Sequence, residues 1–387
     1  MSHPRVAGVG LTHFGEHPER TGRDLFADAG LAALDDSGVD PDDVESLFYG
    51  NFMGELAEHQ GHQGPLMAEA VGLDVPATRF EAACASSGAA IREAVKTVRN
   101  GEADVVLVGG AERMTNIGTP AATDALSIAA DDLYEIRSGM TFPGAYALMA
   151  RSYFREYGGS REDLAAIAVK NHEHALENEY AQLRTEITVE DVLDAPTIAA
   201  PLGLYDSCPI TDGASALVLT SEDYAENHGL DASVGITGTG QGGDNLALHD
   251  REYLARSPAT AEAAEEAYDD AGIGPDDVDV LEVHDCFTIA EVLALEALGM
   301  YEYGEAIAAA RNGETYCTGK LPVNVSGGLK AKGHPVGATG VAQVVALTEL
   351  LEGRFPHADE VDGETAVAHN AGGTVASATV HVLEVVA

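Results

Sequence analysis

Residues 33–45 read ALDDSGVDPDDVE, and residues 267–279 read AYDDAGIGPDDVD, with eight of the thirteen positions identical at an offset of 234 residues. Each copy follows a helical pattern and precedes a strand-like run, SLFYGN in the first case and VLEVHD in the second. Chance similarity between acidic helix ends is the alternative. The shared order of helix, Gly stop, Pro-Asp-Asp and strand favours an internal duplication instead. The sequence therefore predicts two similar α/β halves.

A looser correspondence extends the repeat toward the middle and the end of the chain. Residues 84–112 predict a helix and then the buried strand DVVLVGG, and residues 334–373 predict the loop GHPVGATG, an apolar helix and the strand TAVAHNAGG. Strands that alternate with helices predict largely parallel, buried sheets. Two copies of one unit would place a site where the halves meet.

A different region separates the copies. Residues 118–205 contain the helical patterns GAYALMARSYFREYG and REDLAAIAVKNHEHALEN, followed by Pro196 and Pro201, which predicts an inserted and mostly helical domain. The run DGASALVLTS at 212–221 predicts a strand that returns to the first half.

Composition excludes several function classes. The 387 residues hold 21 Lys plus Arg against 64 Asp plus Glu, a formal net charge of −43, which argues against binding to nucleic acid or to an anionic membrane. The opening residues MSHPRVAGVG do not have the pattern of a secretion signal, and no apolar run reaches the ~18 residues that span a bilayer, so we expect neither a signal peptide nor a membrane span. The four cysteines form no CxxC pair, so we expect reduced thiols and a cytoplasmic location.

The excess of acidic residues also predicts the salt concentration in which the protein is stable. Repulsion among so many carboxylates destabilises a compact chain in dilute buffer, and about 1 M salt screens it because the Debye length falls to about 3 Å. We therefore expect a halophilic host with molar salt in the cytoplasm; an acidic mesophilic protein is the alternative.

Cys84 is the first candidate for chemistry. It stands in ACASSGAAI, just before a helix whose apolar face includes Ile91, Ala94 and Val95. The positive end of that helix favours a thiolate and predicts a pKa below the usual ~8.5. A buried, inert cysteine is the alternative.

Two further segments carry candidate residues. His284 and Cys286 stand at a strand-to-helix junction in VLEVHDCFTIAEV, where both side chains can point into one pocket. His334 stands in SGGLKAKGHPVGATG, whose glycines allow close approach of backbone to a ligand, and HNAGGTVAS at 369–377 can form an anion-binding turn. A solvent-facing strand end and a flexible loop are the alternatives.

Taken together, the segments VAGVGLTHFGEH, GNFMGELAEHQGHQG, ACASSGAAI, VGGAERM, DGASAL, SGGLKAKGHPVGATG and NAGG resemble the thiolase superfamily, in the family's order and over most of the chain. The resemblance implies an α/β fold of two pseudo-symmetric βαβαβαββ halves in five layers, αβαβα, with an inserted loop domain. It places the first half at 1–117 and 206–255, the loop domain at 118–205 and the second half at 256–387.

The chain departs from the common family pattern at two places. Where many members carry Asn-Glu-Ala-Phe and a late Cys-x-Gly-Gly-Gly, this chain reads His284-Asp285-Cys286-Phe287 and Asn370-Ala371-Gly372-Gly373. This combination is similar to the sterol-carrier-protein-x type, which is widespread in archaea. The simplest interpretation is that the second thiol has moved to position 286 within the same pocket.

The resemblance implies thioester chemistry on coenzyme A without a metal or redox cofactor. Cys84 would be acylated, His334 would accept its proton, and Cys286 would remove a proton from a second acetyl-CoA. Oxyanion donors would be His284 with His334 at the enolate, and the N–H groups of Cys84 and Gly372 at the acyl cysteine. Lys330 and Lys332 are the candidates for contacts with coenzyme A. Cys208 and Cys317, which have no comparable motif, would be structural.

The expected activity is that of an acetyl-CoA C-acetyltransferase, with acetyl-CoA, acetoacetyl-CoA and coenzyme A as ligands. The alternatives are a 3-ketoacyl-CoA thiolase of longer chains, a hydroxymethylglutaryl-CoA synthase, which a Glu base would mark, and a non-catalytic acyl-CoA or lipid carrier. The resemblance also implies a homodimer or dimer of dimers. Archaeal relatives are often associated with a small zinc-ribbon and OB-fold protein, sometimes together with the synthase.

Overall fold

The computed structural model describes residues 3–386 of the chain. Its main sheet has nine strands in the order β3-β2-β4-β7-β1-β8-β11-β10-β9. The strands are β1 (Arg5–Leu11), β2 (Ser46–Gly50), β3 (Ala77–Phe80), β4 (Val105–Glu112), β7 (Gly213–Thr220), β8 (Val234–Gly243), β9 (Val280–Glu282), β10 (Thr365–Gly372) and β11 (Ser377–Val385).

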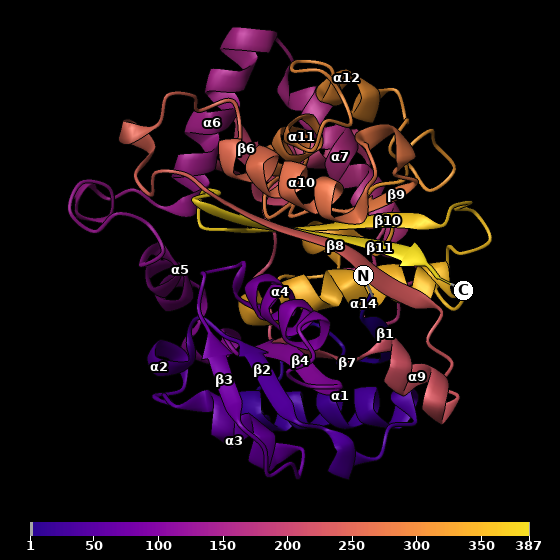
Figure 1. Cartoon of the computed structure of the whole chain (residues 1–387). Helices are drawn as coiled ribbons and strands as arrows, with labels where there is room; N and C mark the ends of the chain where they lie inside the picture. Colours follow the sequence, from indigo (N-terminus) through magenta and orange to yellow (C-terminus); the bar gives the residue numbers. More distant parts are fainter. Residues whose placement is uncertain (1–2, 387) are drawn as a thin grey trace.

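This sheet is folded into two stacked parts. Strand β1 pairs with β7 over most of its length but with β8 only at Arg5 and Val6, so β1 and β8 are joined at one corner. The part β3-β2-β4-β7-β1 lies below the part β8-β11-β10-β9 in Figure 1. Both parts contain long buried strands: β4 and β7 of the lower part are buried along their whole length, and β10 of the upper part is buried at every residue but its first.

Helices fill the space between and outside the two parts. The helices of the two halves are α1 (Gly22–Ser37), α2 (Gly54–Ala57), α3 (Gln63–Ala70), α4 (Ser86–Arg99), α9 (Glu222–His228), α10 (Pro258–Ala271), α11 (Thr288–Ala297), α12 (Ala306–Arg311), α13 (Gly328–Ala331) and α14 (Thr339–Leu351). Helices α1 and α3 cover the lower face, α4 and α14 lie between the sheets, and α10 covers the upper face with α11 behind it (Figure 1). The five layers that the resemblance implies are therefore present.

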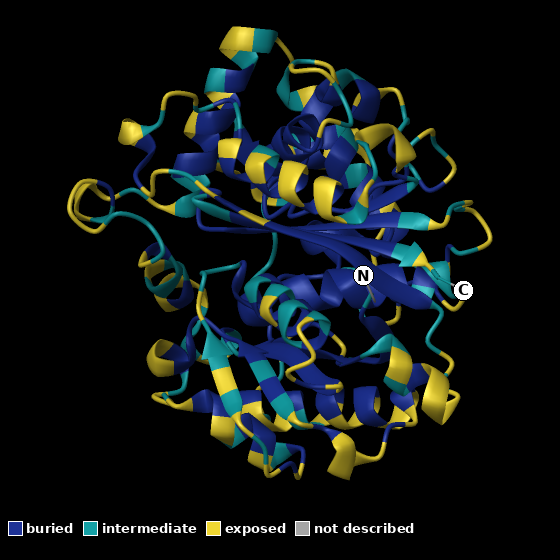
Figure 2. Cartoon of the chain, in the orientation of Figure 1, coloured by how far each residue is buried: buried dark blue, intermediate teal, exposed yellow. Residues whose placement is uncertain are grey.

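The central helices show why these residues form the middle layer. Helix α4 buries Ala90, Ile91, Ala94 and Val95 on one face and keeps Arg92 partly exposed on another. Helix α14 has no continuous polar face and is buried almost throughout, as the dark blue of Figure 2 shows, and its buried Gln343 donates to the His369 carbonyl at 2.8 Å. A helix without a polar face is stable only inside a protein, so the composition of α14 places it between the sheets.

The two copies of the repeat adopt the same structure. Helix α1 ends at Gly38 with φ of 65°, and α10 ends at Gly272 with φ of 76°, a left-handed conformation that glycine adopts without strain. Each helix is followed by a 3₁₀ turn formed by Pro-Asp-Asp, at Pro41–Asp43 and Pro275–Asp277, and then by β2 or β9.

The expectation of largely parallel sheets is wrong. Strand β2 is parallel to β3 and β4, and β9 to β10, but the pairs β4–β7, β1–β7, β8–β11 and β10–β11 are antiparallel. Strand β11 follows β10 after a short turn, and a turn of that length permits only an antiparallel pair. In the second half the counterpart of β3 is reduced to a single bridge between Leu281 and Val323.

Residues 118–205 are mostly helical, as expected. They form α5 (Thr119–Ser127), α6 (Phe142–Tyr157), α7 (Arg161–His174), α8 (Val189–Asp194) and a small two-stranded sheet of β5 (Thr197–Ala199) and β6 (Leu202–Gly203). Helices α6 and α7 pack against α11, so this segment covers the second half and forms one wall of the site described below. Among residues 3–386, no helix combines the length and the apolar character needed to cross a bilayer.

Candidate active site

Cys84 lies on a tight turn immediately before α4. Ala83 adopts φ of 50°, an unusual conformation for a residue with a side chain. The Ser86 hydroxyl holds the turn by donating to the Ala83 carbonyl at 2.5 Å and accepting from the Ala82 N–H at 3.0 Å. This backbone strain costs on the order of 1 kcal/mol, and the turn points the Cys84 sulfur away from the sheet and into a cavity.

The cavity has a volume of about 530 Å³ and lies where the two halves and residues 118–205 meet. Cys84, Cys286 and His334, three of the predicted catalytic residues, line it. Its apolar walls include Leu126, Phe142, Tyr146, Ile198, Leu204 and Phe287. The inserted segment therefore supplies much of the surface against which a substrate would bind.

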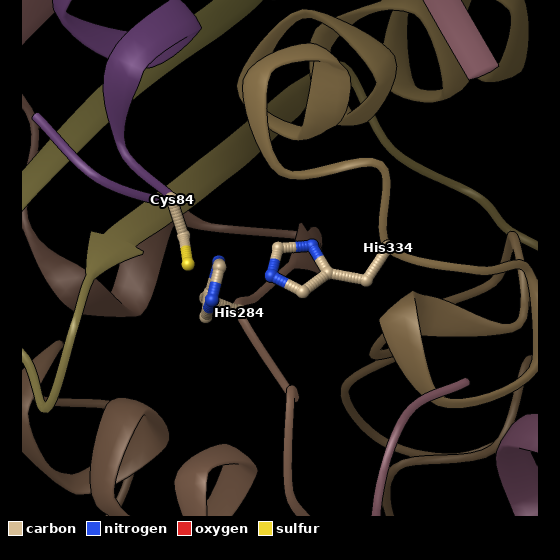
Figure 3. A group of neighbouring side chains, drawn as sticks. All are labelled: Cys84, His284 and His334. Atoms are coloured by element: carbon tan, nitrogen blue, oxygen red, sulfur yellow. The ribbon is translucent and has the colours of Figure 1, made fainter. Parts of the chain in front are cut away.

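Two imidazoles lie next to the Cys84 sulfur. His284 and His334 contact each other edge to face, with ring centroids 4.9 Å apart. Sγ of Cys84 and one nitrogen of each ring lie within 4.8 Å of one another, and Figure 3 shows the three side chains converging on one point. Residues from opposite ends of the chain are brought together, as the sequence predicts.

Hydrogen bonds assign opposite tautomers to the two imidazoles. The Thr339 hydroxyl lies 3.0 Å from the Pro335 carbonyl and 2.7 Å from Nδ1 of His334; in the arrangement in which it donates to the carbonyl, it accepts from Nδ1–H of His334. The Asn370 side-chain amide donates to Nδ1 of His284 at 3.1 Å. A neutral His334 therefore has a free lone pair on Nε2, whereas a neutral His284 has a hydrogen there. Both Nε2 atoms are buried and have no hydrogen-bond partner among the described residues.

Burial keeps the whole group neutral. It raises the pKa of Cys84 to about 12, opposed by a hydrogen bond from the Gly373 N–H, and it lowers the pKa of His334 to about 3. Burial also lowers the pKa of His284 well below its usual value. The expectation that the helix N-terminus lowers the pKa of Cys84 is wrong, because desolvation in the cavity outweighs the helix dipole. A neutral thiol needs a base to become a nucleophile, and Nε2 of His334 is placed to be one.

Cys286 lines the same cavity on the side of the second half. Its side chain hydrogen-bonds to the hydroxyl of Tyr146, and that hydroxyl also donates to the Gly373 carbonyl at 3.0 Å. Burial raises the pKa of Cys286 well above its usual value, and the nearby Cys208 and Cys84 add to this effect. A third thiol, Cys208, also lines the cavity.

Gly372, predicted as an oxyanion donor, and Lys330 and Lys332, predicted to contact coenzyme A, are not among the residues that line the cavity. Gly372 ends β10 and packs closely against the Ala82 carbonyl, while the amide that reaches Cys84 Sγ is that of the next residue, Gly373. Lys330 and Lys332 are each 1% exposed, and Nζ of Lys332 lies 3.5 Å from Glu282. Neither lysine lines the cavity, so their burial does not favour contact with the phosphates of coenzyme A.

Several positioning residues were not predicted from the sequence. Asp285 accepts from the N–H of Leu329 at 2.7 Å and from Asn171 at 2.7 Å, which fixes the backbone between His284 and Cys286. Glu112 accepts from the N–H groups of Phe52, Met53 and Gly337 and from the Asn51 side chain. The sequence does contain one indication for Glu112: it ends an apolar strand. A carboxylate buried at such a place is stable only when hydrogen-bond donors surround it.

The same three side chains have donor atoms that a metal ion could use, since Cys84, His284 and His334 lie close together. The tautomers do not favour this, because the hydrogen bond from Asn370 leaves the hydrogen of His284 on the nitrogen that faces Cys84. A thiol, an imidazole acceptor and an imidazole donor around one point fit acyl transfer to sulfur better than metal binding.

Comparisons with known proteins agree with this chemistry. Residues 6–223 match the family model "Thiolase, N-terminal domain", and residues 240–385 match "Thiolase C-terminal domain-like". The acetyl-CoA acetyltransferase of Methanothermobacter thermautotrophicus is 42% identical over 97% of this chain and 98% of its own. Sterol carrier protein 2 of Rattus norvegicus is 31% identical over 95% of this chain and 69% of its own.

A solved structure described as the Ltp2-ChsH2(DUF35) aldolase matches with a TM-score of 0.84 at 25% identity, over 99% of this chain and 98% of the other. The likeness to both the archaeal enzyme and sterol carrier protein 2 bears out the subfamily that the HDCF and NAGG segments indicate. The chain belongs to the thiolase family and is a thiolase acyltransferase.

Proposed function

We propose that the protein is an acetyl-CoA C-acetyltransferase, which condenses two acetyl-CoA molecules to acetoacetyl-CoA and coenzyme A or runs the reverse thiolysis. The observation that carries the proposal is the arrangement of Cys84 and Cys286 in one cavity beside His334. The relative in Methanothermobacter thermautotrophicus that bears this name supports it.

In the first step, Nε2 of His334 accepts the Cys84 proton while the sulfur attacks the thioester carbonyl of acetyl-CoA. The carbon–sulfur bond to coenzyme A breaks, the leaving thiolate takes the proton from His334, and the acetyl group stays on Cys84. The N–H groups of Cys84 and of Gly372 or Gly373 are the candidate donors to the tetrahedral oxyanion, and each donor typically contributes about 10²–10³ in rate.

In the second step, the thiolate of Cys286 removes a proton from the methyl carbon of a second acetyl-CoA. Nε2–H of His284 donates to the enolate oxygen. The enolate carbon attacks the acetyl carbonyl and the bond to Cys84 breaks. The proton that Cys286 took from the methyl carbon then passes to the Cys84 thiolate by way of Nε2 of His334, so both cysteines return to their starting states. No metal or redox cofactor enters this sequence.

Two alternatives use the same cavity. A 3-ketoacyl-CoA thiolase would accept longer chains, which a volume of about 530 Å³ could hold. A carrier would bind acyl-CoA without releasing coenzyme A. A comparison of acyl-CoA substrates of increasing length in molar KCl separates the three: preference for acetyl supports our proposal, preference for longer chains supports the first alternative, and binding without turnover supports the second.

The decisive test uses the two cysteines. Incubation with acetyl-CoA should add one acetyl group to the wild-type protein and to Cys286→Ala by intact mass spectrometry, but none to Cys84→Ser. Condensation should be lost in both variants. Near wild-type condensation by Cys286→Ala would show that another group is the base.

Further parts of the proposal concern assembly and environment. We propose a cytoplasmic homodimer or dimer of dimers, with the halves and loop domain divided as the sequence suggests. A small zinc-ribbon and OB-fold protein and a hydroxymethylglutaryl-CoA synthase are candidate partners. The first of these is supported by the solved aldolase described above, in which Ltp2 is combined with ChsH2, a DUF35 protein.

The net charge of −43 supports a halophilic host. The melting temperature should then rise steadily from ~0.1 M to molar KCl as the repulsion is screened. Greatest stability at ~0.1 M KCl would argue for an acidic protein of ordinary salt requirement.

A further inference from the structure

A second group of side chains, distant in sequence from the catalytic residues, has the donor atoms of a metal site. Sγ of Cys317, a ring nitrogen of His357 and a carboxylate oxygen of Glu360 lie within 4.8 Å of one another. Cys317 belongs to the loop between α12 and α13, and the other two to the loop between α14 and β10. Cys317 and His357 are 4% and 8% exposed, whereas Glu360 lies at the surface.

The protonation of His357 is fixed by a hydrogen bond on the far side of the ring. Its Nε2 lies 3.0 Å from the backbone carbonyl of His174, which can only accept, so Nε2 carries the hydrogen. Nδ1 of the neutral ring is then an unprotonated acceptor. That atom is buried and has no hydrogen-bond partner among the described residues, and it lies 3.8 Å from Oε1 of Glu360.

This is the arrangement that metal-binding histidines use, in which the nitrogen opposite the ligating one donates to a backbone carbonyl. The same residue, His174 at the end of α7, also fixes the cysteine: its Nε2 accepts from the Cys317 N–H at 3.2 Å, and its Nδ1 faces the Asn324 carbonyl at 3.0 Å. One residue of the inserted segment therefore orients both buried donors.

The surroundings favour a cation. A pocket of about 430 Å³ next to the group is lined by Cys317 and Glu360 and also by the carboxylates of Asp276, Asp279 and Asp362, with Lys320 as the opposing charge. Water entering this pocket could occupy a remaining coordination position.

We propose that Cys317, His357 and Glu360 bind one Zn²⁺ ion at a site separate from the catalytic cavity. Thiolate, imidazole and carboxylate together select Zn²⁺ over the hard cations Mg²⁺ and Ca²⁺, which prefer oxygen ligands. In a tetrahedral zinc site the ligand atoms lie roughly 3.3–3.8 Å apart, so separations of up to 4.8 Å shorten by at most about 1.5 Å when the ion binds. The Zn–S bond forms as the Cys317 thiol releases its proton to solvent.

The ion would act as a structural link. It would tie the loop after α12 to the loop before β10 and hold both against α7, so the second half and the inserted segment would be fastened together at a point away from the cavity. The proposal does not depend on the acetyl-transfer reaction, because no residue of the site contributes to that mechanism.

The test measures metal content and spectra of the full-length protein. After treatment with EDTA, incubation with Zn²⁺ and gel filtration, the wild type should retain one Zn²⁺ per chain by elemental analysis, and Co²⁺ in its place should give a thiolate-to-metal charge-transfer band. Cys317→Ser and His357→Gln should lose both signals. Glu360→Gln, at an exposed position that leaves folding intact, should weaken Zn²⁺ binding by at least ~10-fold.

Two control variants make the assignment specific. Cys84→Ser removes the thiol of the other candidate group and should keep one Zn²⁺, and Asp362→Asn should keep it as well. Wild-type protein that retains no Zn²⁺, unchanged retention in a folded Glu360→Gln and Cys317→Ser, or loss of the ion in Cys84→Ser would each overturn the proposal.

Discussion

The two halves of the molecule use corresponding positions for different purposes. Cys84 precedes the central helix α4 of the first half, and His334 precedes the central helix α14 of the second, so the nucleophile and its base occupy matching places. At the ends of the neighbouring strands β2 and β4, Asn51 donates to Glu112 at 2.8 Å. At the ends of β9 and β10, Asn370 donates to His284 at 3.1 Å.

The difference shows how a duplicated scaffold can divide its tasks. In the first half Glu112 and Asn51 both accept from backbone N–H groups, so they hold loops in place. In the second half the linked imidazole keeps one nitrogen free toward the cavity. The first half thus supplies the nucleophile and a rigid support, and the second supplies the groups that move protons.

The strongest test of this division is removal of the base. His334→Ala should slow acylation of Cys84 by roughly 10²–10⁴-fold, the usual contribution of a general base, because it removes the Nε2 lone pair that accepts the thiol proton. Rapid-quench mass spectrometry of the acetyl-enzyme measures this directly. Thr339→Val, which removes the partner of Nδ1, should cause a smaller loss that Thr339→Ser restores; equal rates in wild type and His334→Ala would disprove the assignment.

Removal of His284, the donor to the enolate oxygen, should affect condensation but not acylation of Cys84. His284→Ala should lower the condensation rate by about 10²–10³-fold while acylation of Cys84 changes little, because the enolate forms only in the second step. Asn370→Ala should lower the condensation rate by a smaller factor and also leave acylation nearly unchanged. It removes the donor to Nδ1 of His284, so the hydrogen is no longer held on Nε2, but the ring remains. If His284→Ala slows acylation as much as condensation, the ring serves the first step as well.

The support in the first half should affect stability instead of chemistry. Glu112→Gln replaces one carboxylate oxygen by an NH₂ group that faces two buried donors, which should lower the free energy of unfolding by about 1–3 kcal/mol. Urea unfolding in molar KCl measures the change. Glu93→Gln, on the exposed face of α4, is the matched control and should stay within about 0.5 kcal/mol.

The sequence was informative where local pattern decides the structure. The repeat at 33–45 and 267–279, the start of α4 after Cys84 and the start of α11 at Thr288 all follow from helix signals that lie within a few residues of one another. The directions of the strands could not be predicted from local pattern. Strand β7 follows the long segment 118–205, and a connection of that length allows it to pair in either direction.

The burial and the partners of individual charged or reactive side chains were also not predictable, because they depend on residues far away in the sequence. Lys330 and Lys332 stand in a glycine-rich stretch that reads as an exposed loop, yet Lys332 is paired with Glu282, fifty residues earlier in the chain. The pKa of Cys84 depends on desolvation by walls that come from α5 and α6 as well as from its own turn. Such long-range burial leaves no periodic signal in the sequence.

The two thiols assigned to the reaction, Cys84 and Cys286, give the last comparison: burial raises the pKa of both, but only Cys84 has an imidazole acceptor beside it. Cys84 transfers its proton to His334 as it reacts, and because the pKa of His334 is about 3 that base is available at every pH from 6 to 9. Acylation should therefore be nearly independent of pH in this range.

Cys286 has the hydroxyl of Tyr146 as its neighbour and must already be a thiolate to remove a proton from carbon. Because its pKa lies well above the usual value, the thiolate fraction, and with it the condensation rate, should rise about tenfold for each pH unit from 7 to 9. Separate pH profiles of acetyl-enzyme formation and of acetoacetyl-CoA release measure the two behaviours. A condensation rate that levels off below pH 8 would mean that a partner lowers the pKa of Cys286 once substrate is bound, and that the second half supplies a base for its own thiol after all.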